Sequence, residues 1–292
     1  MVSRGQDRQE FADFYKYATD RHTLFFTPDD RIKLTRRYTV ATAPVSYVGL
    51  RELTREIDVL RWVVSDTRSC FLTSTAPSSL EVYRGNEYYK TPDEYLLALA
   101  EALRVEYEAI VYAGFHLQVD DAWLVALWDR IGIDMGLEAF KKYCMVRVEA
   151  LNHALRNIPE NLIRYHLCWG SWHGPHASDL PLADIVDVML SVKAKFYSFE
   201  AANVRHEHEY RVWEHVRLPA GKVIMPGVVT HSTDLIEHPM LVSERIQRFA
   251  KLVGPENVIA SCDCGFGGRT HPQIAWAKLA SLCEGARMVD EL

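Results

Sequence analysis

The 292-residue sequence lacks three features that would take it out of the ordinary class of globular proteins. It has no apolar run near the roughly 20 residues that span a bilayer, so we expect no membrane-embedded segment. It has no basic run, and its net charge of −6 argues against a nucleic-acid partner. Its first eight residues turn polar at once and contain no apolar core of a signal peptide. The remaining composition, 48% apolar and 25% charged, is typical of a soluble globular protein.

Cysteine is also scarce, with six residues that follow no regular spacing. A disulfide framework would need a denser and more regular pattern, typical of small secreted domains. A reducing, cytoplasmic location fits this usage best. Thiols in such a compartment remain available to bind a metal ion.

Short β-rich runs alternate along the chain with amphipathic segments, the pattern of a parallel α/β sheet. The expected strands are Cys70–Thr75, Phe115–Asp120, Ile163–Trp169, Lys195–Ala201, Lys222–Val229 and Asn257–Cys264, and the clearest helices are Pro92–Ala113, Gly136–Asn157 and Pro239–Leu252. No linker or repeat interrupts them. We therefore predict one domain over residues 1–292, an α/β (β/α)8 TIM barrel, with a doubly wound open sheet as the alternative.

Two short motifs have the residue types of a metal site. His166 and Cys168 stand two residues apart, as do Cys262 and Cys264 nearly a hundred residues later. In strands, this spacing puts both members of each pair on one face. Nitrogen and thiolate sulfur suit zinc, and a catalytic zinc commonly has three protein ligands and one open position. Either pair alone is more often packing than a metal site, so the argument depends on where the chain places them.

A barrel enzyme carries its chemistry at the carboxyl ends of its strands, and several polar residues lie there in this sequence. Asp120, Glu200 and His231 each stand at or just beyond the end of an expected strand. Taken singly, Asp120 or His231 could cap the next helix, and Glu200 could pair with Arg205. Their convergence with the cysteines on one edge favours a functional site. His173 and His176 fall in a loop beyond a strand end and are candidates to contact a substrate.

Longer motifs give the sequence a resemblance to a known family. They are His166-Leu-Cys-Trp-Gly-Ser-Trp-His-Gly-Pro-His176, Phe199-Glu-Ala-Ala-Asn203, Pro226-Gly-Val-Val-Thr-His231, Cys262-Asp-Cys-Gly-Phe266, Gln118-Val-Asp-Asp121 and Asn86-Glu-Tyr-Tyr89. Together they resemble the catalytic, C-terminal half of cobalamin-independent methionine synthase. The sequence is more similar still to members of that superfamily that resemble epoxyalkane:coenzyme M transferase.

The resemblance implies a barrel that holds one zinc ion, Zn, and activates a small-molecule thiol for attack on a methyl or alkyl donor. By motif, the metal ligands are His166, Cys168 and Cys264, with Glu200 as a carboxylate that coordinates zinc or gives way to the thiol. His231 is the candidate acid that protonates the leaving group. The implied catalytic and substrate-binding residues further include Asp120, Gln6, Trp169, His173, His176 and Asn203.

The sequence also departs from the family. Gln6 stands where methionine synthases have a glutamate that helps to hold the amino-acid substrate, which disfavours homocysteine because its ammonium group needs a negative partner. Cys262 is expected to pack in the core and not to serve as a fourth ligand. By the resemblance, the barrel lacks its first strand and part of its second. Three explanations stay open: residues between Thr35 and Tyr47 fill the gap, another protomer supplies the segment, or the chain is a truncated product. We expect a homo-oligomer.

The sequence thus predicts a zinc-dependent transferase that moves a methyl or larger alkyl group, possibly from an epoxide, onto a thiol. Methionine synthesis from methyltetrahydrofolate and homocysteine is the first alternative. A barrel that has lost catalysis and acts as a binding or partner subunit is the second. The sequence does not identify the thiol or the donor.

Overall fold

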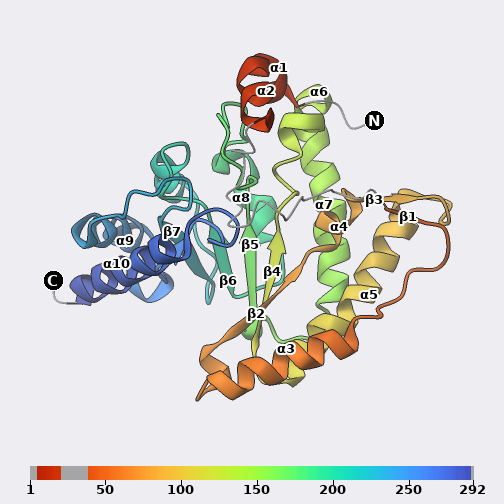
Figure 1. Cartoon of the computed structure of the whole chain (residues 1–292), viewed down its shortest axis with the longest axis horizontal. Helices are drawn as coiled ribbons and strands as arrows, with labels where there is room; N and C mark the ends of the chain where they lie inside the picture. The colour runs from red at the N-terminus through yellow and green to blue at the C-terminus, as the bar shows by residue number, and fades with distance from the viewer. Residues whose placement is uncertain (1–4, 21–38, 291–292) are drawn as a thin grey trace.

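The centre of the molecule is a sheet of six parallel strands, seen in a computed structural model that describes residues 5–20 and 39–290 (Figure 1). Each strand pairs with the next one in chain order. The strands are β2 (Phe71–Thr75), β4 (His116–Asp121), β5 (Ile163–Leu167), β6 (Phe196–Phe199), β7 (Val223–Val229) and β8 (Ser261–Cys262). Within the described ranges, β2 and β8 do not pair with each other, so the sheet is an open half-barrel. This confirms the predicted barrel fold with missing strands, since a doubly wound sheet would reverse its strand order partway.

Helices connect the strands and cover the outer face of the sheet (Figure 1). The longer ones are α5 (Pro92–Tyr112), α7 (Leu137–Ala154), α8 (Leu182–Leu190), α9 (Pro239–Val253) and α10 (Pro272–Asp290), with short α4 (Pro77–Glu81) and α6 (Ile133–Met135) between them. Helix α5 begins as its sequence predicts, because the Thr91 hydroxyl accepts a hydrogen bond from the Glu94 backbone N–H. In the part of the chain that the structure describes, no helix is long and apolar enough to cross a bilayer.

A small separate sheet lies beside the half-barrel. It pairs β1 (Thr39–Ala41) in parallel with β3 (Arg84–Asn86), and α3 (Leu50–Val63) follows β1. The described part of the segment 35–47 therefore does not extend the main sheet, and residues 35–38 lie outside the described ranges.

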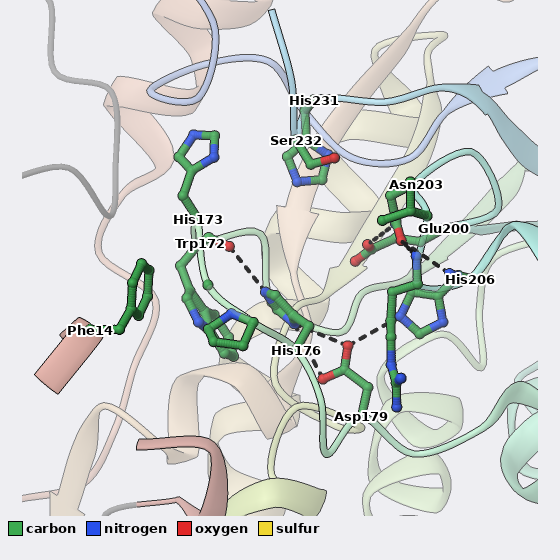
Figure 2. Close-up of a pocket in the computed structure, with 15 residues that line it drawn as sticks. Phe14, Trp172, His173, His176, Asp179, Glu200, Asn203, His206, His231 and Ser232 are labelled. Carbon is green, nitrogen blue, oxygen red and sulfur yellow. Dashed lines mark hydrogen bonds and ion pairs between the residues drawn. The ribbon is translucent and has the colours of Figure 1, made fainter. Parts of the chain in front are cut away.

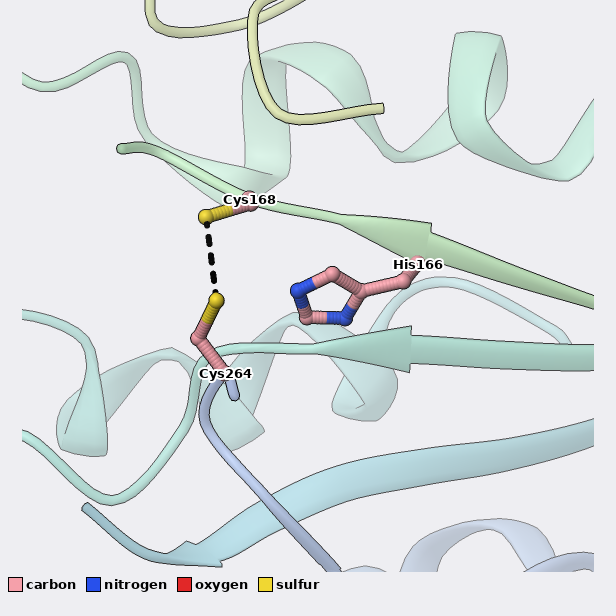
Figure 3. Close-up of side chains that lie close together, drawn as sticks. All are labelled: His166, Cys168 and Cys264. Carbon is pink, nitrogen blue, oxygen red and sulfur yellow. Dashed lines mark hydrogen bonds between the residues drawn. The ribbon is translucent and has the colours of Figure 1, made fainter. Parts of the chain in front are cut away.

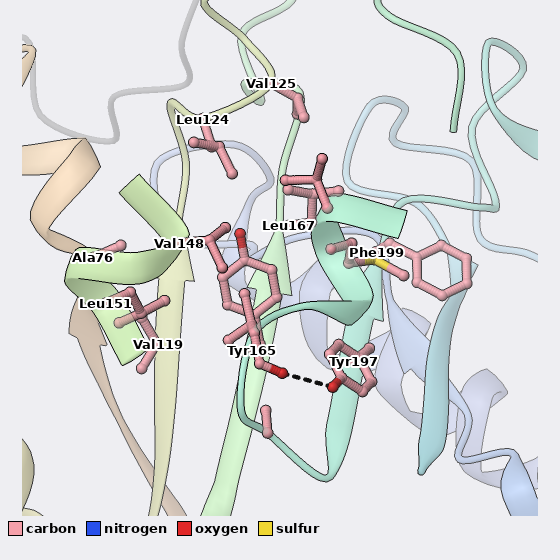
Figure 4. Close-up of a cluster of buried hydrophobic side chains, with 14 of the residues drawn as sticks. Ala76, Val119, Leu124, Val125, Val148, Leu151, Tyr165, Leu167, Tyr197 and Phe199 are labelled. Carbon is pink, nitrogen blue, oxygen red and sulfur yellow. Dashed lines mark hydrogen bonds between the residues drawn. The ribbon is translucent and has the colours of Figure 1, made fainter. Parts of the chain in front are cut away.

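The central strands β4, β5 and β6 alternate between an apolar outer face and a polar inner face, except that Asp121 lies on the outer face and Phe196 on the inner face. Val119, Tyr165 and Tyr197 point outward and are fully buried, and they pack in one cluster with Val148 and Leu151 of α7 (Figure 4). Burying a side chain of this size contributes roughly 1.5–3 kcal/mol, so this packing fixes the register of the strands. The neighbouring residues in sequence consequently face the interior of the half-barrel.

Strands β5, β6 and β8 are each at least two residues shorter than the sequence predicts. Strand β5 ends at Leu167, β6 covers only Phe196–Phe199 of the expected Lys195–Ala201, and β8 contains only Ser261 and Cys262, although the expected strand starts at Asn257. Asn257 instead ends a short 3-10 helix, and the pairing of β7 with β8 slips in register beside Gly227. Cys168 consequently lies in the loop just beyond β5, and Cys264 lies in the loop just beyond β8.

Helices α1 (Gln6–Glu10) and α2 (Ala12–Asp20) lie over the loop that follows β5. The buried Asp7 carboxylate accepts hydrogen bonds from the backbone N–H groups of His176 (3.2 Å) and Ala177 (3.0 Å) and from the Tyr15 hydroxyl (2.9 Å). Trp172 in turn donates its indole N–H to the Tyr15 oxygen. These contacts fix the loop that forms one wall of the site.

Candidate metal centre

Three side chains from the ends of β5 and β8 converge at the edge of the half-barrel (Figure 3). One ligand atom from each of His166, Cys168 and Cys264 lies within 4.8 Å of the other two. The two sulfurs are 3.7 Å apart. His166 and Cys168 share the inner face because they are one strand period apart, and β8 delivers Cys264 opposite them. We call these three residues the metal cluster.

The imidazole of His166 is oriented for metal binding. Its Nδ1 lies 3.0 Å from the Ser198 hydroxyl on the adjacent strand, whereas its buried Nε2 has no hydrogen-bond partner among the described residues. Burial lowers the pKa of His166, but Cys264, Asp120 and Glu200 outweigh it and raise the pKa to about 9. An orphaned ring nitrogen that faces two sulfurs is the arrangement expected of a metal ligand.

The two sulfurs lie within hydrogen-bond distance of each other. The pKa of Cys264 lies well below its usual value, chiefly because of its hydrogen bond with Cys168 and also because His166 is close. The same contact and burial raise the pKa of Cys168 well above its usual value. The backbone N–H of Gly170, held in the left-handed region at φ 90°, also donates to the Cys168 sulfur. The surroundings therefore favour the thiolate form at Cys264 over Cys168, and thiolate is the form that zinc takes.

Glu200 lies beside the metal cluster and contacts Cys168. Its Oε1 accepts the Trp169 backbone N–H at 3.0 Å and lies 3.5 Å from the Cys168 sulfur, and its Oε2 accepts a hydrogen bond from the Asn203 amide. Burial and the charge of Asp263 raise its pKa to about 7. The Glu200 carboxylate therefore lies next to the metal cluster but is not one of its three residues.

Glu200 does not pair with Arg205, whose guanidinium donates to the Ala177 carbonyl. Asp120 is not a helix cap either. It lies opposite His166 in the β4–β5 register and accepts a hydrogen bond from Gln118. Burial raises the pKa of Asp120, and the charge of His166 partly offsets this.

His231 follows β7 and is almost fully buried. Its Nδ1 finds no hydrogen-bond partner among residues 5–20 and 39–290. Burial lowers its pKa, so its imidazole is neutral at neutral pH, and it lies close enough to Cys264 that each shifts the other's pKa. The cap of α9 is His238, which accepts the Met240 backbone N–H, so the alternative reading of His231 as a helix cap is wrong.

A pocket of about 420 Å³ opens beside these residues (Figure 2). Of the expected substrate-binding residues, His173, His176 and Asn203 line it, together with Glu200 and His231. Sequence reasoning missed Phe14, Trp172 and Asp179, which also form its wall, because no spacing links them.

The other expected substrate residues lie outside the lining of this pocket. The Trp169 ring is fully buried and donates its indole N–H to the Leu180 carbonyl at 2.7 Å. Gln6 is exposed on α1, beside the anchoring Asp7.

Asn203 lines the pocket, but every polar atom of its side chain is already hydrogen-bonded within the protein, to Glu200, Asp263 and two backbone N–H groups. Cys262 packs in the small apolar cluster around Val228 and Val229, as expected.

A chain of four ionisable residues, His176, Asp179, His206 and Glu209, begins at the wall of the pocket, and we call it the histidine–carboxylate network. His206 and Glu209 are buried, whereas His176 and Asp179 are half-buried. Asp179 Oδ2 is 3.0 Å from His176 Nδ1 and 3.2 Å from His206 Nε2, and His206 Nδ1 is 2.7 Å from Glu209. Burial lowers the pKa of His206, but Asp179 and Glu209 outweigh it and raise the pKa to about 10. Burial also lowers the pKa of His176, but Asp179 outweighs it and raises this pKa above its usual value. His206 is therefore an imidazolium ion held between two carboxylates.

Comparison with known proteins gives similarity at low identity. No family profile matches the sequence. The methionine synthase of Thermococcus kodakarensis is 24% identical over 236 residues, which is 80% of this chain and 62% of that protein. The methionine synthase of Saccharolobus islandicus is 26% identical over 231 residues, 78% of this chain and 60% of that protein. The chain thus spans about three fifths of the length of the curated relatives it matches.

Two solved structures share the fold. A B12-independent methionine synthase from Shewanella sp. W3-18-1, in complex with selenomethionine, superposes with a TM-score of 0.66 at 18% identity, over 86% of this chain and 70% of that one. A methyltransferase from Methanosarcina mazei gives 0.52 at 16% identity, over 81% and 64%. The chain is thus similar to methionine synthases at low identity and has the fold of a methionine synthase-like barrel.

Proposed function

We propose that the protein is a zinc-dependent transferase that moves a methyl or larger alkyl group onto the sulfur of a small thiol. The observation that carries this proposal is the convergence of one nitrogen and two sulfurs within 4.8 Å, beside Glu200, which contacts Cys168 and lines the pocket. The donor set fits zinc, since one imidazole nitrogen and two cysteine sulfurs are ligands that zinc takes, and the pKa of Cys264 lies below its usual value. When bound, zinc holds a substrate thiol as thiolate near neutral pH, and the thiolate is the nucleophile.

His231 is suited to manage the proton in this reaction. A neutral, buried imidazole with an unpartnered Nδ1 among the described residues can take the proton that the substrate thiol releases. It then returns that proton to the nitrogen or oxygen that leaves the transferred carbon. The proposed acid role therefore follows a first step in which His231 is the base.

The carboxylates have separate proposed roles. Glu200 touches Cys168 and carries a pKa of about 7, so it is the side chain that can approach the fourth ligand position or withdraw when a thiol binds. Asp120, on the inner face beside His166, is proposed to bind a polar group of the substrate. His173 and His176 are proposed to contact the substrate from the pocket wall.

The proposal is tested on purified protein with the metal content measured. The zinc-loaded protein is incubated with homocysteine or 2-mercaptoethanesulfonate, and with methyltetrahydrofolate or a short epoxyalkane, and the products are identified by mass. One alkylated thiol that requires zinc and His166 supports the transferase. Methionine as the product selects the alternative of methionine synthesis, which the curated relatives favour and the exposed Gln6 disfavours. Metal binding with no product from any pair supports a binding or partner subunit.

We also propose that two copies of the chain associate weakly through α3. The outer face of this helix exposes 88% of Trp62 and 59% of Val59. Antiparallel pairing of two α3 helices would put Arg55 of each copy opposite Asp58 of the other and Arg51 over Trp62, which is a self-complementary arrangement. Exposed ion pairs contribute at most about 1 kcal/mol each, so the dimer should be reversible. Sedimentation velocity that shows a concentration-dependent dimer, lost in Trp62→Asp, would support it.

A further inference from the structure

A buried carboxylate between the two cysteines of Cys262-Asp-Cys264 joins the strands that carry the metal cluster. Asp263 is fully buried, although its neighbours in sequence are partly exposed. Its backbone N–H pairs with the Val229 carbonyl on β7, and its side chain crosses to the loop that follows β6. It therefore spans three consecutive strands of the sheet at the edge where the site lies.

The loop after β6 is shaped around this carboxylate. Asp263 Oδ1 accepts the backbone N–H groups of Ala201 and Ala202, both at 2.7 Å, and Oδ2 accepts the Asn203 backbone N–H at 2.9 Å and its amide at 3.2 Å. All four contacts are donors, and a carboxylate is the side chain with enough acceptor sites for them. Asparagine at this position would present an amide N–H₂ to N–H groups that are already donors.

Gly227 on β7 leaves the space that this crossing needs. A Cβ atom at Gly227 would lie 2.1 Å from Asp263 Oδ1 and 2.7 Å from the Asp263 backbone nitrogen. Backbone atoms cannot yield as the end of a flexible side chain can. Any larger residue at position 227 would push Asp263 away from the loop.

We propose that Asp263 is a positioning residue that fixes the Cys264 ligand relative to Glu200. The residue after Asp263 is Cys264, and the residue before its first partner, Ala201, is Glu200. Asn203 extends the link, since its amide donates both to Asp263 and to Glu200. The inference rests on the proposed function, because it concerns the geometry that the metal site presents to an incoming thiol.

The test uses Co²⁺ as a spectroscopic probe in the full chain. Asp263→Asn should lower the affinity for Co²⁺ by about 10- to 100-fold, the range found when an outer partner of a metal ligand is lost, and shift its visible absorption bands. Gly227→Ala should reproduce the shift without removing any charge. Asp121→Asn is the matched control, because Asp121 is equally buried and accepts hydrogen bonds from Ser78, Ser79 and Tyr165, none of which is a ligand.

Wild-type spectrum and affinity in Asp263→Asn would overturn the inference, as would an equal change in Asp121→Asn, which would indicate general destabilisation. If Asp263→Asn does not fold, the Co²⁺ affinity and the visible absorption bands of Gly227→Ala decide instead. A wild-type chain that binds neither Co²⁺ nor Zn²⁺ would refute the proposed function and the inference together. A chain that binds metal but transfers no alkyl group would refute the function and leave the role of Asp263 standing.

Discussion

The metal cluster and the histidine–carboxylate network lie beside the same pocket, yet they satisfy their polar atoms in opposite ways. In the network, both ring nitrogens of His206 face carboxylates, and those of His176 face Asp179 and the Trp172 carbonyl. In the metal cluster, His166 Nε2 has no hydrogen-bond partner in the described chain. Buried polar groups are almost always paired, so a ring nitrogen without a hydrogen bond beside two sulfurs is an arrangement that could hold a metal ion.

Charge distinguishes the two regions in the same way. The network alternates cation and anion, so its charges offset one another internally. Around the metal cluster, burial raises the pKa values of Asp120 and Glu200, which means that their negative charge lacks sufficient compensation. A divalent cation between His166 and the sulfurs would supply it. The comparison therefore distinguishes the histidine cluster that could hold a metal ion from the one whose polar atoms are satisfied within the fold.

The largest expected effect comes from removing a ligand. Cys264→Ala should lower zinc affinity by more than about 1,000-fold, beyond the 10- to 100-fold typical of outer partners, because it removes one of the three ligand atoms, the sulfur whose pKa lies below its usual value. Metal titration against a chelator measures this. Cys262→Ala, two residues away and packed against Val229, should keep wild-type affinity. Equal losses in the two variants would show that the cluster is not the site.

The network should respond to mutation in stability and not in metal binding. Asp179→Asn removes the carboxylate that the buried His206 imidazolium shares with His176, and we expect a loss of roughly 3–5 kcal/mol in the free energy of unfolding. Denaturant unfolding and zinc content, measured on the same sample, separate the two effects. Asp234→Asn on the exposed loop is the control and should change neither. If Asp179→Asn loses zinc but keeps its full free energy of unfolding, the network acts in metal binding and not in stability, contrary to the comparison.

The sequence contains enough information to predict the metal cluster. His166 and Cys168 are one strand period apart, and both cysteine motifs lie at carboxyl ends of parallel strands, which must meet at one edge. The six strands and the three clearest helices follow from alternation and from caps such as Thr91. Strand ends were less predictable, because the slip in register at Gly227 depends on how Asp263 packs across β7.

The network could not be predicted from the sequence. His176 and Asp179 come from the loop after β5, whereas His206 and Glu209 come from the loop after β6 and the 3-10 helix that follows it. The members of each pair are three residues apart, but no spacing relates one pair to the other. Their meeting depends on a left-handed backbone at His176, with φ 52°, and on Asp7 of α1, which holds the backbone N–H of that residue. Such contacts arise from loop conformation and from docking of a distant helix, and neither leaves a local pattern.

A pH titration of stability sharpens the comparison further. The folded pKa of His206, about 10, lies above its ordinary value of 6.5, because Asp179 and Glu209 outweigh burial. Its contribution is therefore complete below pH 6.5 and is lost as the pH rises through 10. We expect the wild type to lose roughly 1–3 kcal/mol more than His206→Gln between pH 7 and 10. The exposed His208→Gln should follow the wild type. Parallel curves for the wild type and His206→Gln would contradict an imidazolium at this position.

The smallest expected effect tests how the protein orients the unpaired nitrogen of His166. The Ser198 hydroxyl, 3.0 Å from Nδ1, fixes the ring so that Nε2 faces the sulfurs. Ser198→Ala should lower zinc affinity by about 10-fold, equivalent to 1.4 kcal/mol, because the ring must then be oriented by the metal itself. Ser232→Ala is a matched control, since Ser232 lines the pocket but its hydroxyl contacts only Thr230 among the described residues. Chelator competition measures both. If Ser198→Ala binds zinc as tightly as Ser232→Ala, packing alone orients the His166 ring. The hydrogen bond from β6 would then contribute nothing to the difference between the metal cluster and the histidine–carboxylate network.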